Sequence, residues 1–256
     1  MSKDVMADLK RDHITKLLSK GMRVDGRKFE EPRPLTVEKN FIRSAEGSAR
    51  VRLGDTDVVV GVKLIVGQPF GDTPNKGVLT TNAELIPLAS ETFESGPPDR
   101  ESIEVARVID RGIREGQAVD MEKLCIKPEE EVWIMFVDIH AIDYDGNLFD
   151  AGNIAAMAAI KSAVVPAQRA GKGDDYPLPV AHVPISVTAV KIAGHILVDP
   201  TFDEEIVAEA RLTVATNEKG DLCAMQKGGE GSFTQEEVIK VVELSRKIGA
   251  EIRSKI

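Results

Sequence analysis

Strand-like alternation followed by a helical pattern occurs twice along this chain of 256 residues, and this repeat constrains the fold most. In 47–67 apolar and polar residues alternate, and a Gly-Asp turn leads into a second, more apolar strand. A helical pattern follows at 102–116. Strand patterns return at 182–200 and 210–229, and an amphipathic helix closes the chain at 234–256. Hairpins followed by a helix, twice over, predict an α+β fold with a loosely duplicated unit.

We expect one domain over residues 1–256, because no low-complexity linker separates the two repeats. Within it, the pattern predicts an N-terminal helical extension at 1–20, a first half at 40–125 and a second half at 130–256. Apolar residues recur at helical spacing in 3–19, so the extension is expected to be an amphipathic helix.

Four connecting passages complete the prediction. The turn-rich, proline-marked passage 23–35 is expected to run over the surface, 132–146 to form a strand, and 150–167 to form a small-residue helix that other elements approach closely. The acidic passage 199–211, "DPTFDEEIVAEAR", follows a strand. Carboxylates in such a place suit acid–base or metal chemistry, but they are also typical of a solvated loop.

Charge and hydropathy exclude several classes of protein. The net charge of −9 argues against broad nucleic-acid affinity, which depends on neutralising phosphates with Lys and Arg, so any polyanion contact must be local. The weakly polar stretch 151–160 is too short to span a bilayer, which needs about 20 apolar residues. The N-terminus mixes both charge signs and lacks an apolar block, so we expect no secretion signal, no membrane and a cytoplasmic location.

The residues that most often bind metals are scattered. The four histidines have no paired spacing, and Cys125 and Cys223 lie too far apart for a metal-type pair. A disulfide between them remains open, although two buried thiols are the expected state in an intracellular chain. We therefore expect no metal and no cofactor.

An ordered set of motifs resembles the RNase PH family. The set comprises "RVDGR" (23–27), "GSARVRLGDTDVVVGV" (47–62), the Pro/Gly-rich loop and helix at 96–111, "DYDGNLFDAGNIAAMAA" and the final strands. The resemblance covers nearly the whole chain from residue 20 onward. It implies an RNase PH-like fold, similar to domain 2 of ribosomal protein S5, and rings of six subunits around a central pore. It also implies phosphorolysis, in which inorganic phosphate releases nucleoside diphosphates from the 3′ end of RNA.

The family's phosphate site is altered here. Active members hold phosphate with a Gly-Ser/Thr-Arg turn at a helix N-terminus, where backbone N–H groups, the helix dipole and a guanidinium converge. At the matching place this chain has Asn147, Leu148 and Phe149, followed by Asp150. The resemblance therefore implies a degenerate phosphate loop, and we expect the Asp150 carboxylate to repel phosphate.

The family's paired carboxylates are altered as well. Active members carry two aspartates six residues apart, which serve as general acid and metal-binding groups. Counting from Asp199, these positions fall on Glu205 and Arg211. An arginine cannot hold a divalent cation or donate a proton near neutral pH. The resemblance therefore predicts no catalytic residues in this chain, an inactive homologue of a phosphorolytic exoribonuclease.

Arginines form a stripe along the helix predicted near 102–116. At about 100° per residue they fall within an arc of about 60°, opposite an apolar face. One reading is a solvated face, with arginines weakly paired to Glu104 and Asp110. The resemblance favours the other reading, RNA binding by Arg107, Arg111, Arg114 and Arg100.

The resemblance is strongest to the catalytically silent subunit of the archaeal exosome ring. It implies an alternating hetero-hexamer, a trimer of heterodimers with a catalytic RNase PH-like subunit, which binds RNA-binding cap proteins and single-stranded RNA. In this reading the chain structures its neighbour's active site and grips RNA phosphates. Two alternatives stay open: a phosphate-dependent 3′–5′ exoribonuclease active by itself, and a purely architectural subunit whose arginines face solvent.

Overall fold

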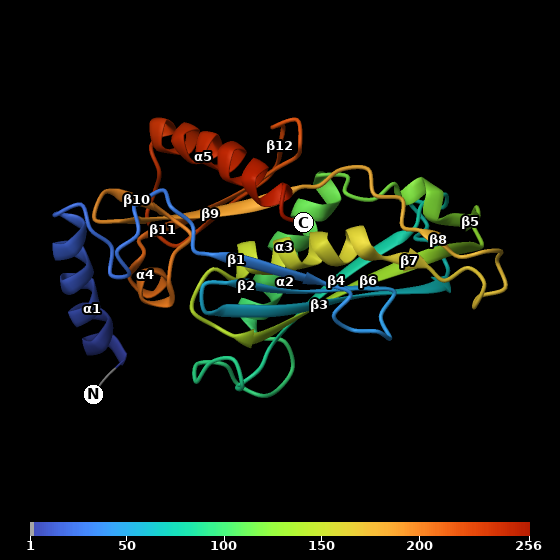
Figure 1. The fold of residues 1–256 in the computed structure, drawn as a ribbon, viewed down its shortest axis with the longest axis horizontal. Helices are drawn as coiled ribbons and strands as arrows, with labels where there is room; N and C mark the ends of the chain where they lie inside the picture. Colours follow the sequence, from blue (N-terminus) through green and yellow to red (C-terminus); the bar gives the residue numbers. More distant parts are fainter. Residues whose placement is uncertain (1–2) are drawn as a thin grey trace.

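Two β-sheets enclose a pair of helices, and a further helix covers the outer face of the second sheet (Figure 1). The computed structural model describes residues 3–256. Residues 1–2 of the predicted extension lie outside the described residues, and the rest of it forms α1 (Lys3–Leu18). Within residues 3–256, none of the helices has the length and apolar character needed to cross a membrane.

The first sheet has the order β1-β2-β3-β6-β4, with β5 paired to β6. Neighbouring strands are antiparallel except β4, which runs parallel to β6. The predicted Gly-Asp turn joins β2 to β3, where Gly54 adopts the left-handed φ of 59° that such a tight turn needs. The strands are β1 (Leu35–Lys39), β2 (Gly47–Leu53), β3 (Thr56–Gly67), β4 (Val78–Leu85), β5 (Cys125–Lys127) and β6 (Glu131–Asp143).

The second sheet is antiparallel, with the order β10-β9-β11-β12. Its inner strand β9 is buried along nearly its full length, as expected for a strand with helices on both faces. Its strands are β9 (Ile185–Ile192), β10 (His195–Val198), β11 (Ala210–Thr216) and β12 (Leu222–Gly228). A short ladder pairs β7 (Val164–Val165) with β8 (Tyr176–Pro177), and Met121–Leu124 form a 3₁₀ turn.

Helix α3 (Leu148–Ser162) lies between the two sheets, and α2 (Arg100–Glu115) packs against it and against β4. The small residues predicted for α3 allow α2 to approach it closely: a Cβ on Gly152 would lie 2.6 Å from Ile109 Cδ1 of α2. Helix α5 (Gln235–Arg253) covers β9 and β11 and begins with a capping box of Thr234 and Glu237. The axis of α2 is therefore fixed against α3, with one long face left outside.

The predicted α+β architecture is confirmed. The two sheets do not divide where the halves were expected to meet. Strand β6 begins at Glu131, within the predicted second half, yet it pairs with β3 and β4 of the first sheet. One hydrophobic cluster joins residues of both sheets, so we infer a single domain.

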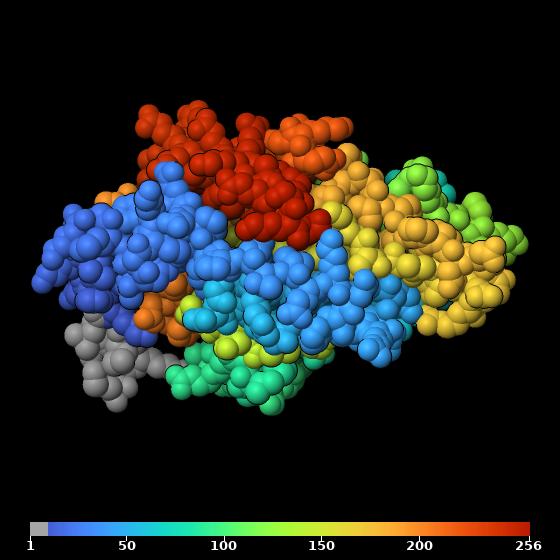
Figure 2. Space-filling view, in the orientation of Figure 1, coloured from blue at the N-terminus to red at the C-terminus, as the bar shows by residue number. Residues whose placement is uncertain are grey.

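Segments that are distant in sequence meet at the N-terminal end. Helix α1 packs on α4 (Phe202–Val207), a short helix within the acidic passage 199–211. Figure 2 shows the N-terminal residues lying against the second half of the chain. A small cluster that includes Ile14, Leu18 and Leu197 seals the contact.

Candidate nucleic-acid interface

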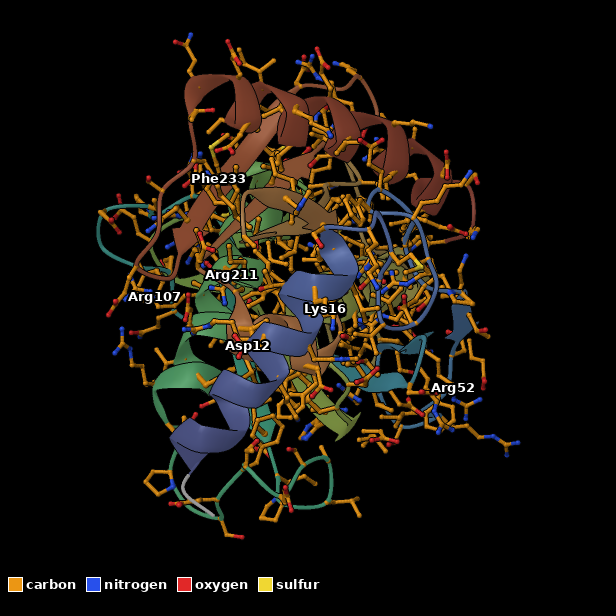
Figure 3. The ribbon with its side chains drawn as sticks, turned by 90° about the vertical axis from the view of Figure 1, so that its left-hand side faces the viewer. Asp12, Lys16, Arg52, Arg107, Arg211 and Phe233 are labelled. Carbon is orange, nitrogen blue, oxygen red and sulfur yellow. The ribbon has the colours of Figure 1, made fainter. Side chains whose placement is uncertain are left out.

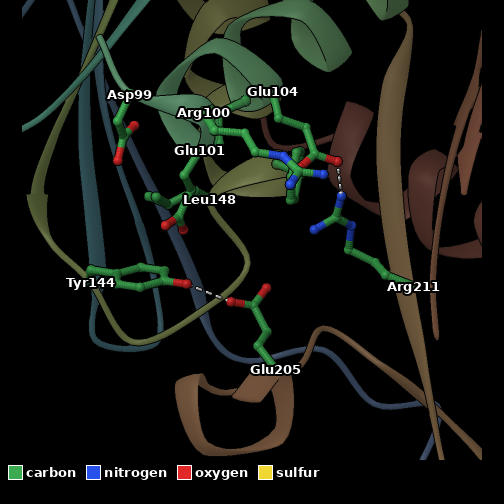
Figure 4. Close-up of a pocket in the computed structure, with 10 residues that line it drawn as sticks. Asp99, Arg100, Glu101, Glu104, Tyr144, Leu148, Glu205 and Arg211 are labelled. Carbon is green, nitrogen blue, oxygen red and sulfur yellow. Dashed lines mark hydrogen bonds and ion pairs between the residues drawn. The ribbon is translucent and has the colours of Figure 1, made fainter. Parts of the chain in front are cut away.

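Two neighbouring hollows lie beside α2, one at its N-terminal end and one along its outer face. The first is a cavity of about 380 Å³, where the starts of α2 and α3 approach each other (Figure 4). Carboxylates, two arginines and apolar or ring side chains line it: Asp99, Arg100, Glu101, Glu104, Val105, Tyr144, Leu148, Phe149, Glu205 and Arg211. It contains the predicted positions of both altered motifs.

The start of α3 is closed by side chains of the chain itself. Asn147 is the N-cap, with the left-handed φ of 56°, and its side-chain oxygen accepts a hydrogen bond from the backbone N–H of Asp150. Leu148 and Phe149 follow and are only 4% and 5% exposed. Where an anion would need hydroxyl and guanidinium donors, this turn presents apolar surface.

Glu205 occupies a second donor at this helix start, the backbone N–H of Asn147. Its carboxylate accepts hydrogen bonds from the backbone N–H of Asn147, at 3.0 Å, and from the Tyr144 hydroxyl, at 2.6 Å. Burial raises the pKa of Glu205, although both hydrogen bonds and the charge of Arg211 act to lower it. An internal carboxylate thus sits where the helix N-terminus would otherwise attract an anion.

Asp150 does not face the cavity, so the expectation that its carboxylate repels phosphate there is wrong. Its side chain turns inward, where its oxygens accept hydrogen bonds from Asn147 Nδ2 at 2.8 Å, Thr188 N at 2.9 Å and Thr188 Oγ1 at 2.7 Å. Burial raises the pKa of Asp150 to about 7, against these hydrogen bonds. Asp150 fixes α3 to β9, and the carboxylate that lines the cavity at this helix start is Glu205.

Arg211 separates the cavity from the second hollow. It projects from β11, forms an ion pair with Glu104 of α2, and lies over the Phe149 ring with Cζ 4.0 Å from the centroid (Figure 4). Arg211, Glu104 and Arg100 line both hollows. A guanidinium therefore braces α2 against β11 at the predicted position of a catalytic carboxylate.

The outer face of α2 carries the predicted arginines. Asp99 caps the helix by accepting a hydrogen bond from Ser102 N at 2.8 Å, and the expected core face is buried at Val105, Ile109 and Ile113. Arg100, Arg107, Arg111 and Arg114 are all exposed.

The four arginines have different surroundings. Arg114 donates hydrogen bonds to both oxygens of Asp110, at 3.0 and 2.9 Å, and to the Leu79 carbonyl, at 3.0 Å. This pairing with Asp110 is the one expected if the arginines form only a solvated helix face. Glu104, the other acid expected beside the stripe, pairs with Arg211 of another element. Arg111 donates to Gln226 Oε1 of β12 at 3.2 Å.

The second hollow is a groove of about 570 Å³ between α2 and the hairpin of β11 and β12. Two of its lining residues, Arg107 of α2 and Arg211 of β11, are labelled in Figure 3. Cations dominate its lining, which comprises Arg100, Ile103, Glu104, Arg107, Val108, Arg111, Arg211, Gln226, Lys227, Gly228 and Gly229. Arg114 lines a smaller hollow of about 240 Å³ beside it, together with Arg107 and Arg111. The geometry suits an extended polyanion.

Comparison with known proteins identifies the family. Residues 31–166 match the 3′ exoribonuclease family, domain 1 (RNase PH), and residues 182–248 match domain 2 of the same family. The chain belongs to the RNase PH family.

Curated members similar to this RNase PH-family chain share its full length. Exosome complex component Rrp42 of Methanocella arvoryzae is 51% identical over 256 residues, covering 100% of this chain and 98% of that protein. The same component of Thermococcus kodakarensis is 53% identical over 261 residues, covering 99% and 96%. The solved Archaeoglobus fulgidus exosome with RNA bound to the active site contains a chain with a TM-score of 0.95 and 49% identity, covering 98% and 99%. The predicted resemblance is confirmed.

In this RNase PH-family chain the passage 23–35 runs largely over the surface, as expected, but two of its arginines are buried against the acidic passage 199–211. That acidic passage is therefore not the solvated loop that stayed open as an alternative. Arg23 bonds both carboxylate oxygens of Glu204, at 2.9 and 2.5 Å, and Arg33 bonds both oxygens of Asp199, at 3.0 and 2.8 Å. All four side chains are at most 5% exposed. Burial opposes ionisation of Asp199, yet the hydrogen bonds and charge of Arg33 lower its pKa. We call these two pairs the arginine clasp.

Sequence analysis missed the wall of the groove opposite α2. Gln226 and Lys227 come from β12, and only the pairing of β11 with β12 brings them beside Arg211. The strand patterns over 210–229 were predicted, but not that the edge strand would face α2. In the part of the chain that the structure describes, no group of three or more His, Cys, Asp or Glu side chains is arranged to hold a metal ion.

Proposed function

We propose that the chain is the non-catalytic subunit of an archaeal exosome ring. In this ring it alternates with the catalytic RNase PH-like subunit as a trimer of heterodimers, binds RNA-binding cap proteins, and works in the cytoplasm. Support comes from relatives named Exosome complex component Rrp42, at 51% and 53% identity over nearly the full chain. A similar chain in an exosome solved with RNA bound to the active site adds to it.

The side-chain contacts at the N-terminus of α3 are the observation that best supports the absence of catalysis in this chain. Phosphorolysis needs a site where free phosphate meets backbone N–H groups and a guanidinium. Here Glu205 accepts the Asn147 N–H, Leu148 and Phe149 fill the turn, and Arg211 is paired with Glu104. Phosphate entering this cavity would meet the Glu205 carboxylate at the helix start, and Arg211 stands at one of the two positions that the family's paired carboxylates would occupy.

The chain's contribution to RNA degradation is then made from outside its own cavity. The rigid α2 presents Arg107 and Arg111 toward a groove that can hold the backbone of a single strand. Guanidinium groups bind phosphates without reading bases, so this subunit guides RNA irrespective of sequence. The catalytic partner supplies phosphate binding, acid and metal, while this chain structures the partner's active site and holds the incoming strand.

Co-expression with the catalytic relative from the same genome tests the proposal. We expect a hexamer of alternating chains by native mass measurement, and phosphate-dependent release of nucleoside diphosphates that the catalytic chain alone performs less well. A homomeric assembly, or equal activity with and without this chain, would contradict the proposed role. Full activity without any RNA cross-link to α2 would favour the architectural alternative.

A further inference from the structure

The groove beside α2 has a second wall that none of the predicted RNA-binding residues occupies. Edge strand β12 forms it through Gln226, Lys227, Gly228 and Gly229, and Arg211 of β11 lies between the walls. Arg111 Nη1 reaches across to Gln226 Oε1 at 3.2 Å, so the two walls are within side-chain reach of each other.

The charge of the groove is opposite to that of the molecule. The chain carries a formal net charge of −9, yet this groove is lined by cations with a single carboxylate, Glu104. That carboxylate already forms an ion pair with Arg211. Converging cations on an acidic chain raise the local concentration of a polyanion at this one place. The cations are Arg100, Arg107, Arg111, Arg211 and Lys227.

The second wall is shaped around Arg211. Gly228 stands opposite Arg211 in the ladder, and a Cβ there would lie 2.7 Å from Arg211 Nη2. The Nε of Arg211 is buried and has no hydrogen-bond partner among the residues that the structure describes. Lys227 is exposed, and its Nζ is held only by the Gly229 carbonyl at 2.6 Å, a neutral acceptor that a phosphate replaces readily.

We propose that the β12 wall is a second phosphate-binding surface, in which Lys227 together with Arg211 contacts the backbone of single-stranded RNA opposite Arg107. This inference rests on the proposed function and extends its RNA site from one helix to a two-sided groove. Within the described residues the lining contains no aromatic ring, so the groove holds the strand by its phosphates without base stacking. Two charged walls also fix the direction of the strand, which a single helical stripe leaves free.

Removing one cation from each wall tests the assignment in the reconstituted ring. Lys227→Gln should lower affinity for a single-stranded oligoribonucleotide about fivefold at 0.1 M salt. It should also reduce the slope of log K against log salt by about 0.7, the value for one lost phosphate contact. Lys219→Gln is the matched control, because Lys219 is an exposed lysine in the turn of the same hairpin, outside the groove. This control should leave both affinity and slope unchanged.

Arg107→Gln separates failure of this inference from failure of the proposed function. If Arg107→Gln reduces the salt slope and Lys227→Gln does not, the proposed phosphate contact on the β12 wall is refuted and the proposed function stands. If neither variant changes RNA binding, both are wrong. If Lys227→Gln prevents ring assembly, as judged by native mass measurement, the wall is a subunit interface and the inference is overturned.

Discussion

Two buried acids whose pKa values are shifted in opposite directions meet at Asn147. Its Nδ2 group donates to Asp150 Oδ2 at 2.8 Å and to Asp199 Oδ1 at 2.7 Å, while Arg33 neutralises Asp199. Without a cationic partner, Asp150 loses hydration and has a pKa raised to about 7. The start of α3 is therefore fixed by one amide that bridges an acid with a lowered pKa and an acid with a raised pKa.

Stability should fall as pH rises through the titration of Asp150. Its pKa lies near 3.8 in the unfolded chain and about 7 in the folded one, so between these values the folded state binds more protons. The free energy of unfolding contributed by this group therefore falls from about pH 4 to about pH 7, by at most about 1.4 kcal/mol per unit.

Asp150→Asn should remove this dependence and leave stability at pH 8 equal or higher. The amide oxygen can accept from Asn147 and Thr188 N, and its NH₂ can donate to Thr188 Oγ1. Urea unfolding between pH 4 and 8 measures the effect. An unchanged pH slope in Asp150→Asn would show that another group titrates there.

Restoring a carboxylate at position 211 should not restore catalysis. Arg211→Asp returns one acid, but Glu205 still accepts the Asn147 N–H, and Leu148 and Phe149 still fill the phosphate turn. We expect no phosphate-dependent release of nucleoside diphosphates from this variant, measured alone and at high phosphate concentration. Activity at wild-type levels of the family would mean that the anion site is intact despite these contacts.

At the scale of elements, α2 combines a fixed core face with a charged outer face. Arg107→Glu with Arg111→Glu should weaken RNA binding by the assembled ring and reduce its salt slope by about 0.7 for each lost contact. Arg43→Glu, an exposed arginine outside the groove, is the matched charge-reversal control. Titrations with labelled RNA from 50 to 200 mM salt measure both quantities. Equal slopes in the double variant and the control would refute the helix assignment.

The arginine clasp ties the passage after α1 to α4. Arg23→Met leaves the Glu204 carboxylate buried without its partner, which typically costs about 3–5 kcal/mol. Adding Glu204→Gln should recover part of this loss, because a neutral amide still accepts the Thr201 N–H at the helix start. Lys240→Met breaks an exposed pair with Glu30 and should cost less than about 1 kcal/mol. Urea unfolding of these three variants measures the loss in free energy of unfolding. Equal losses for the buried and the exposed ion pair would contradict a stabilising role of the arginine clasp.

The helices and hairpins could be predicted because their signals are local. The apolar spacing of α2, the capping box of α5 and the Gly-Asp turn before β3 each lie within a few residues. The partners of β6 could not be predicted, since strand pairing depends on contacts far apart in sequence. The apolar residues at the phosphate turn were found from the resemblance, because they lie within one short motif. The inward direction of Asp150 and the approach of Lys227 to α2 were not, because they depend on contacts with residues far away in sequence.

At the scale of the whole molecule, the cavity at the start of α3 and the groove beside α2 share part of their lining. The ion pair of Arg211 with Glu104 lines both the cavity at the start of α3 and the groove with its five cations. Under the proposed function, we expect this acidic chain to bind RNA at this basic groove, at the place where the ring presents it. Function at this scale is therefore expected of the ring and not of the isolated chain.

The most direct measurement is turnover of an oligoribonucleotide by this chain purified on its own, with and without added orthophosphate. We expect no release of nucleoside diphosphates under either condition, and phosphate-dependent release only once the catalytic partner is added. Phosphate-dependent shortening of the RNA from its 3′ end by the isolated chain would contradict the central claim.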